Sequence, residues 1–109
     1  MLRLWILSLR VNNMNTDVIA DVWNTINQRM EERPDGSYVV SVLTHRKGVD
    51  KALEKVGEEA TEFILAAKNG SSERTVEEAA DLLFHIMLAL RASGEDMGDV
   101  LEELSRRRH

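Results

Sequence analysis

The chain has 109 residues, the size of one domain, and a net charge of −5 that argues against a general nucleic-acid binder, because such proteins need a basic surface. It has no cysteine, which excludes a disulfide scaffold, a thiolate zinc site and a cysteine nucleophile. Its hydrophobic fraction of 43% is too high for a disordered tail.

The first 13 residues, MLRLWILSLRVNN, differ in character from the rest of the chain. Their apolar run is too short to span a membrane, which takes about 20 apolar residues. Arg10 interrupts the run and no small-residue cleavage site follows, so a secretory signal is not favoured. We interpret residues 1–13 as an N-terminal extension and residues 14–109 as the domain. A membrane anchor formed by residues 1–9 remains an alternative.

The next segments predict a long helix, a turn and a short helix. Helical spacing of apolar residues predicts a helix over 16–32, and the cluster RPDGS at 33–37 predicts a turn. Residues 38–45 could suit a strand, but the chain offers no partner strand, so a short helix is favoured. The apolar positions of the first helix are Val18, Ile19, Val22, Trp23, Ile26 and Met30.

Three further helices are predicted over 49–69, 73–93 and 96–108, the first two closed by Gly70 and Gly94. The sequence therefore predicts an all-α bundle of four to five helices with short loops. Residues 82–90 are apolar in almost every direction, and a helix that is apolar all round is buried. In so short a chain this predicts burial by the bundle and by a second subunit, as in a homodimer or higher homo-oligomer.

Charged side chains gather on one side of the 49–69 helix. With Glu58 set at zero, Glu62 lies at about 40° and Glu59 at about 100°, with Lys51 and Lys55 at about 20° and 60°. Taken alone, this is an ordinary amphipathic helix with a solvated charged face.

The following helix places Glu78 and Asp81 three residues apart, with His85 one turn further, beside the apolar segment. Buried charges must be paired or must hold a metal. Simpler interpretations exist: acids favour a helix N-terminus, Asp81 could pair with Lys51 or Lys55, and His85 could be a hydrogen-bonded core histidine.

Two antiparallel helices joined by a short loop would bring the two sets of acids level: Glu58, Glu59 and Glu62 on one helix, Glu78 and Asp81 on the next. Five carboxylates in one cleft cannot all stay ionised unaided, and divalent cations resolve that repulsion. A site made only of oxygen ligands favours Mg²⁺, or Mn²⁺, over zinc. Such a site suits a substrate that carries phosphates.

Three sequence segments carry a resemblance to known proteins: KVGEEATE at 55–62, AAKNG at 66–70 and EAADLLFH at 78–85. The E-E-x-x-E and E-x-x-D motifs resemble the signature of the all-α nucleotide pyrophosphohydrolases of the MazG-like superfamily. The residues around and between these motifs resemble the phosphoribosyl-ATP pyrophosphohydrolase family, over roughly 18–108.

The resemblance implies an enzyme that hydrolyses phosphoribosyl-ATP to phosphoribosyl-AMP and pyrophosphate with Mg²⁺, the second step of histidine biosynthesis. It implies a cytoplasmic helical dimer. Members of the family are often fused to a cyclohydrolase, and since no such domain is present here, the chain looks like the stand-alone form. In that chemistry Glu59 or Glu62 would orient or deprotonate the attacking water. Lys51, Lys55 and Lys68 could meet phosphate oxygens, and Asn69 could hydrogen-bond the substrate or only cap its helix.

Two other functions remain open from the sequence. One is a house-cleaning pyrophosphohydrolase of the same superfamily that acts on non-canonical nucleoside triphosphates. The other is a non-catalytic helical dimerisation module, which needs the apolar faces and uses the acids only for solubility.

Overall fold

A computed structural model describes residues 17–108 of the chain. Those residues form α2 (Asp17–Glu32), α3 (Tyr38–Leu43), α4 (Val49–Lys68), α5 (Ser72–Ala92) and α6 (Met97–Arg107), without a strand among them. The predicted all-α fold and the short helix after the turn are thus confirmed. Over the same range no helix is long and apolar enough to cross a membrane. The predicted N-terminal extension and its alternative as an anchor lie outside the described residues.

Local sequence signals explain where the helices begin and end. The side chains of Ser37, Ser71 and Asp96 accept hydrogen bonds from backbone N–H groups in the first turns of α3, α5 and α6. Gly70 and Gly94 follow α4 and α5 with φ of +78° and +79°, a conformation that favours glycine. The predicted helix ends are therefore correct within one or two residues.

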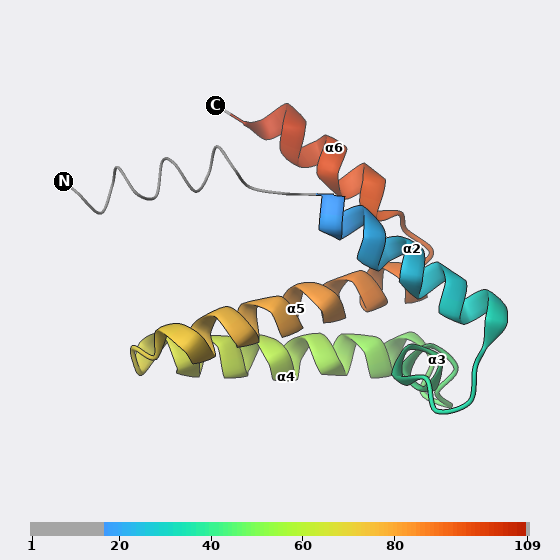
Figure 1. Cartoon of the computed structure of the whole chain (residues 1–109), viewed down its shortest axis with the longest axis horizontal. Helices are drawn as coiled ribbons and strands as arrows, with labels where there is room; N and C mark the ends of the chain where they lie inside the picture. Colours follow the sequence, from blue (N-terminus) through green and yellow to red (C-terminus); the bar gives the residue numbers. More distant parts are fainter. Residues whose placement is uncertain (1–16, 109) are drawn as a thin grey trace.

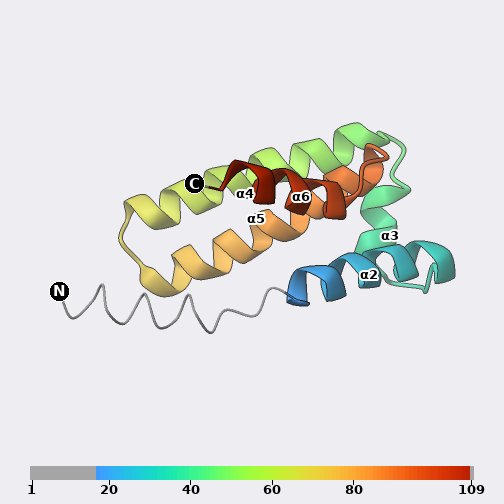
Figure 2. The same cartoon turned by 90° about the horizontal axis from the view of Figure 1, so that it is seen from above.

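The centre of the fold is the antiparallel hairpin of α4 and α5, which lie side by side in both views (Figures 1 and 2). A short loop joins them at one end of the hairpin. Because the hairpin is antiparallel, the beginning of α4 lies beside the second half of α5. At this other end α2 and α3 pack across the hairpin (Figure 1).

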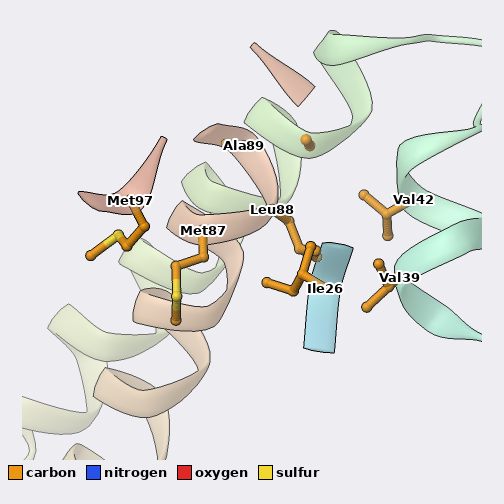
Figure 3. Packing of buried hydrophobic residues seen from close by; sticks show 8 residues of the cluster. Ile26, Val39, Val42, Met87, Leu88, Ala89 and Met97 are labelled. Carbon is orange, nitrogen blue, oxygen red and sulfur yellow. The ribbon is translucent and has the colours of Figure 1, made fainter. Parts of the chain in front are cut away.

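The hydrophobic core fills this second end of the hairpin. Ile26 of α2 and Leu88 of α5 are fully buried and lie against each other, with Val39 and Val42 of α3 facing them (Figure 3). This core fixes α3 against α5 and so determines what stands next to the acidic side chains further along the hairpin. Within residues 17–108 the buried residues of this core are Ile26, Val39, Val42, Ala52, Met87, Leu88, Ala89 and Met97.

The prediction that 82–90 is buried on every side is only partly correct. Met87, Leu88 and Ala89 are buried, but Leu83 is 54% exposed in the single chain. The reason is that α5 has neighbours around only part of its circumference. On α4, Ile64 is likewise 62% exposed. One copy of the chain therefore leaves an apolar strip of the hairpin uncovered.

Candidate functional site

The hairpin brings Glu59 of α4 together with Glu78 and Asp81 of α5. One carboxylate oxygen from each lies within 4.8 Å of the other two. Glu78 and Asp81 share a helix face because they are three residues apart, and the short loop sets them level with Glu59. Glu59 and Glu78 are buried whereas Asp81 is exposed, so these three carboxylates, hereafter the acidic triad, open to solvent on the Asp81 side.

Glu78 is the member of the triad whose surroundings most favour the binding of a cation. Its side chain is only 5% exposed, and Oε1 lies 2.9 Å from Nη2 of Arg74. Oε2 is buried and has no hydrogen-bond partner among the described residues. Burial first, then the nearby Glu62 carboxyl, raises the pKa of Glu78, and Arg74 offsets this only in part. A buried carboxylate oxygen without a partner destabilises the fold unless something binds it.

The other two predicted ligands lie at the edge of the triad. Glu62 is exposed and close enough to Glu78 to raise its pKa. Glu58 is exposed and accepts a hydrogen bond of 2.8 Å from Nζ of Lys55, which lowers the pKa of Glu58. The same Nζ lies 3.8 Å from Glu59. The structure thus groups three of the five acids, whereas Glu58 forms an ion pair with Lys55.

The predicted substrate-binding residues divide between the two ends of α4. Lys55 borders the triad, and Lys51, one turn earlier, is half-buried and lowers the pKa of Glu58. Lys68 is exposed near the α4–α5 loop, six residues or about 9 Å beyond Glu62.

At the end of α4 the backbone N–H of Asn69 donates to the carbonyl of Leu65, and the N–H of Gly70 donates to that of Ala67. Within residues 17–108, the side chains of Lys68 and Asn69 form no ion pair or hydrogen bond that would join them to the triad. The structure therefore shows Asn69 as the C-cap of α4, and its contact with a substrate stays a prediction.

His85 confirms the core-histidine interpretation. It is 7% exposed; Nδ1 lies 2.7 Å from the backbone oxygen of Asp81, and Nε2 lies 2.9 Å from the hydroxyl of Tyr38. The alternative in which Asp81 pairs with Lys51 or Lys55 is not found among residues 17–108, where Asp81 is exposed without an ion pair.

Two residues beside the site were not anticipated from the sequence. Arg74 stands four positions before Glu78, a helical spacing that predicts an ion pair and could have revealed it. Tyr38 lies 47 positions from His85 in the sequence, and no local sequence pattern predicts their contact.

The donor set and its surroundings determine what the triad can bind. It offers carboxylate oxygens alone, on rigid helices, with one side open to solvent. Hard divalent cations such as Mg²⁺ and Mn²⁺ prefer oxygen ligands and keep open positions for water or phosphate. The acidic triad is therefore a candidate metal centre.

The chain is similar in sequence to the proteins of one known family. The family described as phosphoribosyl-ATP pyrophosphohydrolase matches residues 19–108. A protein of Methanoculleus marisnigri named phosphoribosyl-ATP pyrophosphatase is 66% identical over 92 residues, which cover 84% of this chain and 95% of the relative. Proteins of the same name from Methanosphaerula palustris and Haloarcula marismortui are 60% and 41% identical, over 86% and 84% of this chain and 95% and 94% of theirs.

Proposed function

The chain belongs to the phosphoribosyl-ATP pyrophosphohydrolase family, and we propose that it hydrolyses phosphoribosyl-ATP to phosphoribosyl-AMP and pyrophosphate. Family membership confirms the expectation of a hydrolase. The observation that carries the finer proposal is the 66% identity with the Methanoculleus marisnigri protein over nearly its whole length. We place the reaction in the cytoplasm, as the second step of histidine biosynthesis.

Glu59, Glu78 and Asp81 would hold the Mg²⁺ ion that this chemistry calls for, with Mn²⁺ as a substitute. The unpartnered Oε2 of Glu78 supports this proposal, because it is a buried acceptor for which the described residues supply no donor. Bound there, the ion would neutralise negative charge on the triphosphate and on the departing pyrophosphate.

Three further side chains take part in the proposed hydrolysis. Glu62 is exposed beside the triad, next to Glu78, where its carboxylate would orient the attacking water and accept its proton. The water oxygen forms a bond to the α-phosphorus while the α–β anhydride bond breaks and pyrophosphate leaves. Lys55, at the edge of the triad, supplies a positive charge for a phosphate oxygen, and Lys51 adds a second.

We also propose that the chain works as a homodimer or a higher homo-oligomer. Leu53, Ile64 and Leu83 are 51%, 62% and 54% exposed on the hairpin of the single chain. Large apolar side chains gathered on one surface typically mark an interface, and a second copy would bury them.

The test is a comparison of substrates. Pyrophosphate release should be fastest from phosphoribosyl-ATP and weak from dCTP, dUTP and dITP. The reverse order would assign the chain to the house-cleaning relatives. No release from any of them, with thermal stability unaffected by Mg²⁺, would leave a non-catalytic dimerisation module.

A further inference from the structure

Arg74 stands beside the acidic triad without a role in the hydrolysis proposed above. Nη2 of its guanidinium lies 2.9 Å from Oε1 of Glu78, and Nη1 lies 3.6 Å from Glu77. Arg74, Glu78 and Asp81 recur at helical spacing, so they lie within about 60° of one another around α5. The guanidinium therefore extends the face of α5 that carries two of the three triad acids.

Neutralisation of the buried Glu78 does not by itself account for Arg74. An arginine can bond both oxygens of a carboxylate, yet Oε2 of Glu78 is buried and has no hydrogen-bond partner within residues 17–108. The Arg74 side chain is 59% exposed, so part of the guanidinium faces solvent beside the triad. Its backbone N–H bonds to the capping Ser71, which places it in the first turn of α5, where the helix dipole disfavours a cation. Arg74 thus satisfies Glu78 only in part and keeps donors available for an anion.

Arg74 and Lys55 stand at opposite ends of the triad. Each precedes a triad acid by one helical turn: Arg74 precedes Glu78 on α5, and Lys55 precedes Glu59 on α4, with Nζ 3.8 Å from its carboxylate. Since the hairpin is antiparallel, the turn before Glu59 leads toward α3, whereas the turn before Glu78 leads toward the α4–α5 loop (Figures 1 and 2). The triad therefore has one positive charge on each side along the hairpin, an arrangement that suits a chain of phosphates.

The α3 end of the hairpin also carries an exposed aromatic ring. Tyr38 of α3 stacks on Phe84 of α5 with ring centroids 6.5 Å apart, and 46% of Tyr38 is exposed. Phe63, the aromatic residue of α4 on the loop side of Glu59, is less exposed than Tyr38. A purine base can stack on an open aromatic face, so the α3 end suits the base of a nucleotide better than the loop end does.

We propose that Arg74 holds the leaving pyrophosphate, so that the triphosphate runs from the base at the α3 end of the hairpin toward the α4–α5 loop. In the chain without metal, Arg74 pairs with one oxygen of Glu78 and competes with a cation for this carboxylate. Once Glu78 is bound to a cation, the planar guanidinium is free to bond two oxygens of a phosphate. This inference rests on the proposed function, because it orients the substrate of that reaction.

Binding measured by calorimetry tests Arg74→Met without turnover. The variant should bind Mg²⁺ alone at least as tightly as the wild type does, because a competing positive charge has been removed from Glu78. At saturating Mg²⁺ it should bind inorganic pyrophosphate about tenfold more weakly, the value of a hydrogen bond to a charged group. Its affinity for AMP, which lacks the two leaving phosphates, should equal that of the wild type. Arg74→Lys keeps the charge without the planar fork, so its affinity for pyrophosphate should be intermediate.

Arg107→Met is the matched control, since Arg107 is an exposed arginine of α6 that pairs with Glu103 one helical turn away, at 2.8 Å. It should leave all three affinities unchanged. A purely structural Arg74 would show weaker binding of Mg²⁺, pyrophosphate and AMP alike in Arg74→Met. That result, a loss confined to AMP, or wild-type affinity for pyrophosphate would overturn the proposal. No turnover of phosphoribosyl-ATP by the wild type would instead refute the proposed function, and the affinities for Mg²⁺ and pyrophosphate would still decide on Arg74.

Discussion

Glu78→Gln, compared with Glu77→Gln, separates a metal ligand from a surface acid. Both side chains face Arg74, at 2.9 Å for Glu78 and 3.6 Å for Glu77, and both substitutions remove one negative charge. Only Glu78 is buried in the triad, since the Glu77 side chain is 53% exposed. The pair therefore controls for the loss of charge and for the contact with Arg74.

The expected size follows from binding linkage. With free Mg²⁺ at ten times its dissociation constant, binding to the native state adds about 1.4 kcal/mol of stability. For a domain of this size that raises Tm by roughly 6–11 °C. Changes to groups that merely support metal ligands weaken binding by about 10–100-fold. Loss of a ligand should reach at least the lower value, and at the same Mg²⁺ concentration the shift in Tm would then fall to about 2–3 °C.

The assay is thermal unfolding followed by circular dichroism, with and without Mg²⁺. Wild type and Glu77→Gln should show the full shift and Glu78→Gln a small fraction of it. Without metal at pH 7, Glu78→Gln should unfold at the same or a higher temperature than wild type, because burial raises the pKa of Glu78 and disfavours its charge. A full Mg²⁺ shift in Glu78→Gln would refute the assignment of this residue to the metal.

Four other measurements test the core, the titration of the tyrosine and the interface. Leu88 is fully buried, so Leu88→Ala should lower the free energy of unfolding in urea by about 2–5 kcal/mol, and a loss below about 1 kcal/mol would contradict the assigned core. Burial raises the pKa of Tyr38 above 10, so the folded chain should keep that proton longer than the unfolded chain and lose stability as pH rises beyond 10. Glu59→Gln should lower this pKa, seen by absorbance, since the carboxylate helps to raise it; a rise would count against the geometry. Leu83→Lys should reduce the mass measured by light scattering toward that of one chain while helicity is kept, whereas an unchanged oligomer would place the interface elsewhere.

The helices were predictable because their signals are local. Apolar residues at helical spacing identified α2, and the glycines after α4 and α5 marked where those helices end. The short loop between them was enough to predict an antiparallel hairpin with acids on both sides.

The orientation of α4 was not predictable to the same accuracy. Glu58 and Glu59 are about 100° apart on the helix, so one can face α5 only if the other turns away. Periodicity alone did not decide between them, since both belong to the charged side of α4. Packing decides: Ala52, Glu59 and Ala66 recur every seven residues and are buried, which turns Glu58 outward to Lys55.

Contacts between distant parts of the chain were also beyond the sequence. The pairing of Tyr38 with His85 depends on how α3 docks on α5, which the core around Ile26 and Leu88 sets. The exposure of Leu83 in the single chain was also beyond the sequence, because a hydrophobic pattern predicts that a side chain will be covered but does not say whether its own chain covers it.

The most direct measurement of the central claim is pyrophosphate release from phosphoribosyl-ATP as Mg²⁺ is titrated into metal-free protein, for wild type and Glu59→Gln. Glu59 is buried in the triad, so the wild type should release pyrophosphate only with Mg²⁺, and Glu59→Gln should be slower by about 100-fold or more at the same Mg²⁺ concentration. Full activity of the wild type in excess chelator, or wild-type activity in Glu59→Gln, would contradict a reaction that depends on a metal held by the acidic triad.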